Sequence, residues 1–178
     1  RRRGGARRTV DPHRCILPEA LEARRLMAYS LAVNFQPAGA SVPPGYVADT
    51  GQTYADRGNG HTFGWDLGNT TATRDRNNSL SPDQRYDTLT HTQAFGARTW
   101  EVAVANGQYQ VRIVAGDARY TDSVYAFDAE GTNVISPTPA SEARWADGMR
   151  VVTVSDGRLT ITNAAGASNN KLCFVQIN

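Results

Sequence analysis

Short stretches in which apolar and polar residues alternate dominate the chain from residue 30 onward. The segments 30–36 and 123–130 alternate in this way, as a strand does when one face is buried and the other meets water. The chain closes with an apolar run at 171–177, which contains Cys173 at a position where cysteine is usually a small buried hydrophobe. We therefore predict strands at all three segments.

Two Asx-Gly pairs mark turns within this pattern. Asn106-Gly107 lies inside the apolar-rich segment 100–114, and Asp156-Gly157 lies inside the similar segment 151–162. Such pairs accept the positive φ angles of tight β-hairpins, so each is predicted to join two strands locally. About eight or nine short strands with regular turn signals, and no convincing helix after residue 30, are typical of an all-β sandwich or barrel.

Charge divides the chain into an arm at residues 1–30 and a body at residues 31–178. The arm holds eight arginines and three acidic residues, a net charge of +5, whereas the body holds eleven basic and fourteen acidic residues, a net charge of −3. A basic arm can contact nucleic acid or an anionic membrane, but an export or anchoring segment is the simpler interpretation. Because the body is slightly acidic and shows no basic stripe, we expect no nucleic-acid partner. No apolar run reaches the roughly 18 residues of a membrane span, so we expect none.

The second half of the arm carries a helical pattern. Residues 17–28 are predicted to form a short helix, in which Pro18 suits the first helical position. The stretch 21–28 resembles the Leu-Glu-Pro-Arg type of motif found near the N-terminus of many exported bacterial proteins, with Ala23 in place of the proline. This similarity favours an extracellular or cell-surface location in a bacterium. The arm is then a linker, and residues 31–178 form a single binding domain.

Familiar catalytic motifs are absent from the sequence. There is no Gly-x-Ser-x-Gly, no His-Glu-x-x-His and no phosphate-binding loop. His13, His61 and His91 are scattered, and no pair of carboxylates for glycoside hydrolysis can be assigned. We therefore expect no enzymatic activity. A small polysaccharide lyase or hydrolase stays open as an alternative, and it requires a cleft in which His61 or His91 meets a tyrosine, an arginine and an acid.

Aromatic residues lie mostly in or beside the loops, where they are mixed with Asn, Asp and Arg. A flat ring can stack on the apolar face of a pyranose. The hydroxyl groups of that sugar then need fixed polar partners, because an unpaired buried donor costs about 1–3 kcal/mol. The mixture therefore indicates a carbohydrate-binding surface, although about half of the rings, including Trp100 and Phe174, are expected to fill the core.

Alternating oxygen side chains in one polar loop suggest a metal site. Calcium takes six to eight oxygen ligands, and this loop offers one at every second position: Asp75, Asn77, Ser79, Ser81 and Asp83. The glycine and glutamate of an EF-hand are missing, so an ordinary polar loop is the plainer interpretation. Asp117, Asp122 and Asp128 form a weaker candidate of the same kind.

A series of stretches in the body occurs in an order that resembles a known class of modules. The stretches include Val-Asn-Phe-Gln-Pro, Arg-Tyr-Asp-Thr-Leu and Ser-Asn-Asn-Lys-Leu-Cys-Phe, and they lie at residues 33–37, 49–54, 58–65, 85–89, 100–107, 116–117 and 168–174. They resemble malectin-like domains and the related galactose-binding-like modules, including carbohydrate-binding families 6 and 35. The resemblance implies a two-sheet antiparallel β-sandwich of the jelly-roll type.

The same resemblance implies where a sugar binds. In such modules the site lies in loops at one edge of the sandwich, with aromatics from the early loops and an Asn or Asp just before the last strand. Carried over by position, the ligand-binding residues are Tyr54, Phe63, Trp65, Tyr120, Asn169 and Asn170. Modules of this kind often hold a structural Ca²⁺, so calcium is the one cofactor that we expect.

The sequence therefore predicts a secreted, non-catalytic module that binds a polysaccharide or an oligosaccharide. A second hypothesis is a structural subunit of an extracellular assembly or filament, in which the arm at residues 1–30 docks onto another copy. An arm that is fixed against a second chain favours the assembly, whereas a loose arm favours a tether.

Overall fold

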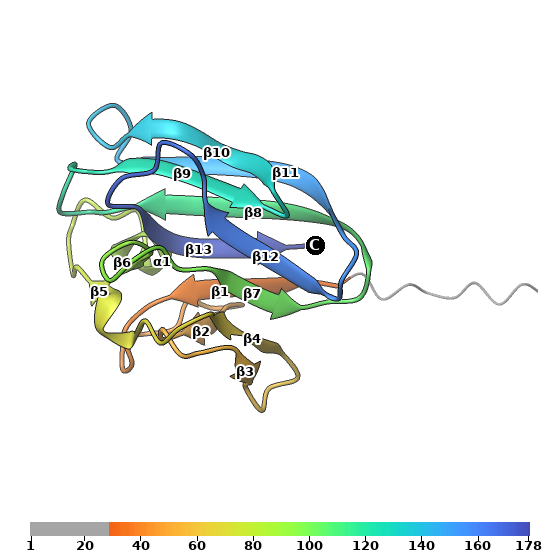
Figure 1. Cartoon of the computed structure of the whole chain (residues 1–178). Coiled ribbons are helices and arrows are strands. Elements are labelled where there is room, and N and C mark those ends of the chain that lie inside the picture. The colour runs from red at the N-terminus through yellow and green to blue at the C-terminus, as the bar shows by residue number, and fades with distance from the viewer. Residues whose placement is uncertain (1–28) are drawn as a thin grey trace, which may run out of the picture.

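The computed structural model describes residues 29–178, which form two β-sheets packed face to face (Figure 1). Sheet A has seven strands, with the order β11-β8-β13-β1-β2 and with β6 on β13 and β5 on β6. Its pairs are antiparallel except for β1 with β2, which run parallel. The strands are β1 (Leu31–Phe35), β2 (Val47–Asp49), β5 (Thr73–Asp75), β6 (Thr88–His91), β8 (Gly107–Gly116), β11 (Trp145–Val154) and β13 (Lys171–Ile177).

Sheet B has six strands in the order β10-β9-β12-β7-β4-β3. They are β3 (Ala55–Asp56), β4 (Thr62–Trp65), β7 (Trp100–Ala103), β9 (Val124–Ala129), β10 (Thr132–Pro139) and β12 (Arg158–Asn163). Within residues 29–178, the only helical elements are the 3-10 turn η1 (Thr70–Ala72) and the short helix α1 (Gln84–Asp87). This architecture confirms the predicted all-β, two-sheet antiparallel sandwich of the jelly-roll type.

The two Asx-Gly pairs connect strands of different sheets, so the prediction of two local hairpins is wrong. β7 pairs with β12 and β4, whereas β8 pairs with β11 and β13. Asn106 ties the two connections together, because its Nδ2 donates to the carbonyl oxygen of Ser155 at 2.9 Å and its Oδ1 accepts from the Gly157 N–H at 2.8 Å. The strands lie where the sequence placed them, but the burial of their inner faces decides which strands pair.

The interior between the sheets is built around three aromatic rings. Phe35 packs edge-on against Trp65 and Trp100, with centroid separations of 5.6 Å in both cases. Both indole N–H groups donate to the carboxylate of Asp49, at 2.9 and 2.8 Å. A buried indole needs an acceptor, and Asp49 supplies one for each tryptophan. Burial raises the pKa of Asp49, while these hydrogen bonds and that from the Gly51 N–H oppose the rise.

A second, smaller apolar cluster covers the outer face of sheet A. Its buried members are Leu89, Val114, Cys173 and Phe174, and Tyr46, Tyr86 and Trp145 pack against them. Trp100 and Phe174 are therefore both buried, as predicted, but on opposite sides of sheet A. Cys173 is also buried, and burial raises the pKa of its thiol.

Residues 1–28 lie outside the described part of the chain. The predicted helix at 17–28 and the export motif therefore stay predictions. Within residues 29–178, no helix is long and apolar enough to cross a membrane.

Candidate functional site

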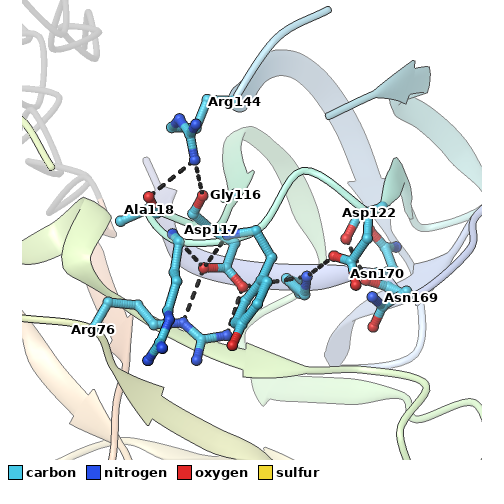
Figure 2. A network of polar contacts seen from close by, with 12 residues as sticks. Arg76, Gly116, Asp117, Ala118, Asp122, Arg144, Asn169 and Asn170 are labelled. Atoms are coloured by element: carbon cyan, nitrogen blue, oxygen red, sulfur yellow. Dashed lines mark hydrogen bonds and ion pairs between the residues drawn. The ribbon is translucent and has the colours of Figure 1, made fainter. Parts of the chain in front are cut away.

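Three loops meet where β8 ends and β13 begins, at the left of Figure 1. Residues 117–123 follow β8, residues 164–170 precede β13, and Arg76 directly follows β5. Figure 2 shows the polar contacts that join these loops. We call the group formed by Arg76, Asp117, Tyr120, Asn169 and Lys171 the loop-end site.

Asp117 is the buried anion at the centre of this site. Its Oδ1 accepts from Arg76 Nε at 2.9 Å and from the Arg119 N–H at 2.8 Å, and its Oδ2 accepts from Arg76 Nη2 at 2.6 Å (Figure 2). Burial opposes ionisation of Asp117, but these hydrogen bonds and the charges of Arg76 and Lys171 together lower the pKa of its carboxyl group. Asp117 therefore stays charged and fixes the turn that presents Tyr120.

Lys171 is the only lysine of the chain and is 1% exposed. Its ammonium group lies 2.8 Å from Asp122 Oδ1 and 3.2 Å from Asp117 Oδ2. A buried ammonium is costly unless it is paired, and Lys171 has two carboxylate partners. Hydrogen bonding to Lys171 lowers the pKa of Asp122. The pair of contacts holds the start of β13 against the loop that follows β8.

Tyr120 presents its ring at the surface and is 45% exposed. Three cations surround the ring, with the guanidinium carbons of Arg76 and Arg119 at 5.0 and 5.4 Å from its centroid and Lys171 Nζ at 5.9 Å. Cations at these distances are attracted to the ring quadrupole and restrict how the ring moves. The Tyr120 side chain is therefore held among three cations while part of it stays exposed.

The two asparagines before β13 have different roles. Asn169 is partly exposed, has a φ of 49°, and uses its backbone oxygen to accept from Ser123 Oγ at 2.8 Å. No hydrogen bond within residues 29–178 engages its side-chain amide. Asn170 is fully buried, and its Nδ2 donates to the Ala126 oxygen at 2.7 Å. Asn170 is therefore structural, which corrects its predicted role in ligand binding, whereas Asn169 has an amide available to a ligand.

His91 pairs with Lys171 across the β6–β13 ladder. Burial and the charges of Lys171, Arg74 and Arg76 lower the pKa of His91 to about 4. The imidazole is therefore neutral at physiological pH. No hydrogen bond within the described residues joins the ring of His91 or of His61 to a tyrosine, an arginine or an acid.

The loop-end site offers both parts of a sugar-binding chemistry. Tyr120 supplies a partly exposed aromatic side chain, and Asn169 supplies an amide that donates and accepts hydrogen bonds. Arg119 is exposed and forms no ion pair within residues 29–178, so its guanidinium is a further free donor. The buried pairs of Arg76 and Lys171 with Asp117 hold these groups in place.

The structure does not bring the other predicted aromatics to this site. Phe63 and Trp65 are each only 1% exposed and belong to the core between the sheets, so their assignment to ligand binding is wrong. Both side chains point from β4 into the core, and β4 pairs with the central strand β7. Tyr54 lies under the guanidinium of Arg158, at 4.3 Å, beside the first residue of β12. Asn169 follows the opposite end of that strand, which is roughly 20 Å long.

Two of the predicted calcium ligands are engaged in contacts within the protein. The carboxylate of Asp83 is held by Arg85 at 2.6 Å, and Asp75 Oδ1 accepts from the backbone N–H of Asn77. Within residues 29–178, no three His, Cys, Asp or Glu side chains are grouped so that they could hold a metal ion. Calcium binding by Asp75, Asn77, Ser79 and Asp83 stays a prediction, and two of the three weaker candidates, Asp117 and Asp122, share the ammonium of Lys171.

The basic residues of the site, Arg76 and Lys171, and the neighbouring Arg119 were not among the predicted ligand-binding residues. One signal was available, because the only lysine of the chain begins an apolar strand, where a cation requires a buried acid. The partner of that lysine could not be read from the sequence, since Asp117 lies 54 positions earlier. The position of Arg76 depends equally on how β5 and β6 extend sheet A.

Comparison with known proteins shows which solved structures are similar to this chain. No protein-family model matches the chain, and no curated protein sequence matches it. Among solved structures, protein YxiM from Bacillus subtilis is 22% identical with a TM-score of 0.58, over 84% of this chain and 40% of its own length. Bacteroides uniformis β-glucuronidase 2 is 16% identical with a TM-score of 0.60, over 88% of this chain and 18% of that protein.

A third solved structure is also similar to this chain. A chain in the complex of the plant peptide RALF23 with FER and LLG2 is 15% identical with a TM-score of 0.52, over 84% of this chain and 39% of its own. The protein has a galactose-binding-like fold. This fold is the one that the sequence resemblance implied. The chain spans less than half of the length of each of these three proteins.

Proposed function

We propose that this galactose-binding-like domain binds carbohydrate at the loop-end site without chemically changing it. The observation that carries the proposal is the exposed ring of Tyr120, fixed by Arg76, Arg119 and Lys171. Such a ring can stack on the apolar face of a pyranose. Arg119 lies on the same loop as Tyr120 and Asn169 lies on the neighbouring loop, and both can bind the hydroxyl groups of that sugar.

The shape of the site supports modest affinity. Tyr120 lies on an open surface, so a bound sugar would bury few of its atoms, and affinity is limited by how much of the ligand leaves water. The buried ion pairs under the ring compensate in part, because a preorganised surface loses little conformational entropy when it binds.

A binding role fits the site better than a catalytic one. His91 is the only histidine beside the loop-end site within the described residues, and its pKa of about 4 leaves it unprotonated at neutral pH. A general acid works best with a pKa near the working pH. Asp117 is held as a carboxylate by two cations and fills a structural role.

We also infer that the domain works outside the cell, as a module of a secreted or surface protein. Domains of similar fold form only part of larger proteins such as Bacteroides uniformis β-glucuronidase 2. The alternative of an assembly subunit depends on residues 1–30, most of which lie outside the described part of the chain.

A polysaccharide-binding assay with matched variants tests the proposal. A glycan array followed by affinity electrophoresis in gels containing soluble xylan, galactan, mannan or pectin would identify the ligand for the wild-type protein. Tyr120→Ala is expected to weaken binding about tenfold or more, since the aromatic contact and the buried apolar area are both lost. Tyr54→Ala is the control, because Tyr54 is a partly exposed tyrosine stacked with an arginine near the other end of β12.

Two outcomes would contradict the proposal. The first is wild-type protein that is retarded by none of the polysaccharides and binds no glycan on the array. The second is binding that Tyr120→Ala leaves unchanged while Tyr54→Ala abolishes it.

A further inference from the structure

A hollow of about 310 Å³ lies apart from the loop-end site, beside the outer face of sheet A. It is lined by Pro43, Pro44, Tyr46, Asp83, Gln84 and Arg85. These residues come from the loop before β2 on one side and from the start of α1 on the other. Its volume is at the lower end of the range of about 300–1,000 Å³ that is usual for ligand pockets, so it has room for a small group such as one sugar ring.

One wall of the hollow is apolar and rigid. The wall is formed by the exposed Pro44 and by Pro43, which is largely buried, and Tyr46 is held edge-on against Phe174 with a centroid separation of 5.8 Å. The hydroxyl oxygen of Tyr46 accepts from Gln176 Nε2 at 2.9 Å, which fixes the ring further. This wall offers flat apolar surface that loses little entropy when a ligand packs on it.

The opposite wall is polar and equally fixed. Arg85 donates from Nε and Nη2 to the two oxygens of Asp83, at 2.9 and 2.6 Å, and its guanidinium lies 5.4 Å from the Phe174 ring. Hydrogen bonding to Arg85 lowers the pKa of Asp83, so the carboxylate is an acceptor at neutral pH. The ion pair has no net charge, which favours an uncharged ligand over an acidic or basic one.

Several polar atoms of this wall have no partner within residues 29–178. Arg85 has five N–H groups, of which two bind Asp83 and one makes a long contact of 3.4 Å with the Tyr46 hydroxyl. Two N–H groups of Arg85 and the proton of the Tyr46 hydroxyl are therefore free donors. The Oε1 atom of Gln84 is a free acceptor. Adjacent hydroxyl groups of a sugar both donate and accept, and so match such a set.

We propose that this hollow is a second carbohydrate site, which binds one neutral sugar ring between the prolines and the Arg85–Asp83 pair. This inference rests on the proposed function, because it takes the ligand to be a carbohydrate. Phe174, beneath Arg85, lies three residues after Lys171 on β13, about 10 Å along the strand. The two sites are thus near neighbours, and one polysaccharide chain can engage both.

The stoichiometry of binding tests this inference. The probes are xylotriose, galactotriose, mannotriose and cellotriose, titrated into the full chain and followed by calorimetry and native mass spectrometry. Wild-type protein is expected to bind two copies of at least one of these trisaccharides. Tyr120→Ala should bind one copy, and the double variant Tyr46→Phe with Gln84→Ala should also bind one.

The variants are chosen to leave the fold intact. Tyr46→Phe keeps the ring that packs on Phe174, and alanine at Gln84 suits the first residue of α1. The control Gln108→Ala removes the same type of side chain from an exposed position of β8, outside the hollow, and should still bind two copies.

The outcomes separate the two proposals. One copy bound by wild type, lost in Tyr120→Ala and kept in the double variant, would overturn the second site alone. One copy lost in the double variant and kept in Tyr120→Ala would support the hollow and overturn the loop-end site. No binding of any trisaccharide, with no retention on any polysaccharide gel, would overturn both.

Discussion

Replacing Lys171 by methionine removes the ammonium group on which the loop-end site is built. Lys171 is 1% exposed and contacts the fully buried Asp117 as well as Asp122, whose side chain is 60% exposed. Breaking a buried ion pair typically costs about 3–5 kcal/mol, because one charge is left buried without its partner. Asp117 keeps its two bonds from Arg76, so we expect the lower end, about 3 kcal/mol.

Urea denaturation measures this effect directly. In thermal unfolding, a loss of 1 kcal/mol lowers the Tm of a domain of this size by about 2–4 °C, so the variant should melt roughly 6–12 °C lower. Asp147→Asn is the control, because it removes one partner of the largely exposed Arg112–Asp147 pair and should cost less than about 1 kcal/mol. If both variants lose the same small amount, the reasoning that Lys171 is a buried anchor is refuted.

The remaining predictions concern the core, the asparagines and the dependence on pH. Trp65→Phe leaves the Asp49 carboxylate with one donor fewer and should lower the free energy of unfolding by about 1–3 kcal/mol in urea, without changing glycan binding. Asn170→Ala should destabilise the fold by a similar amount, whereas Asn169→Gly should keep stability and weaken glycan binding; the reverse result would contradict their assigned roles. The folded state holds His91 neutral with a pKa of about 4, against an ordinary value of 6.5, so stability that is fully present above pH 6.5 should decline as the pH falls toward 4. His91→Gln should reduce this decline in urea midpoints measured at pH 7 and pH 5, and an unchanged decline would show that other groups cause it.

The strand positions followed from the sequence because alternation is a local property. The segments 30–36, 123–130 and 171–177 all contain strands of the structure. Strand pairing was harder to predict from the sequence, as the Asn106-Gly107 and Asp156-Gly157 turns show. A turn signal reports only that the chain reverses, whereas the choice between pairing locally and crossing to the other sheet depends on how all strands share one core.

The candidate site was predicted in part. Tyr120 and Asn169 lie at the loop end of the sandwich, where the resemblance placed the ligand. Phe63 and Trp65 were wrongly assigned to the ligand site, because an aromatic residue in a short strand beside a long loop looks the same in sequence whether it points inward or outward. The acceptor that decides the matter, Asp49, is brought to Trp65 only by the pairing of distant strands.

The central claim is that a sugar stacks on Tyr120, and backbone amide chemical shifts measured during titration with a bound oligosaccharide test it most directly. The account predicts that the amide signals of residues 117–122 and 168–171 shift together and saturate with one binding curve. Signals in β3, β4 and around Tyr54 should stay in place. Shifts confined to those strands, with residues 117–122 unaffected at saturation, would contradict the account.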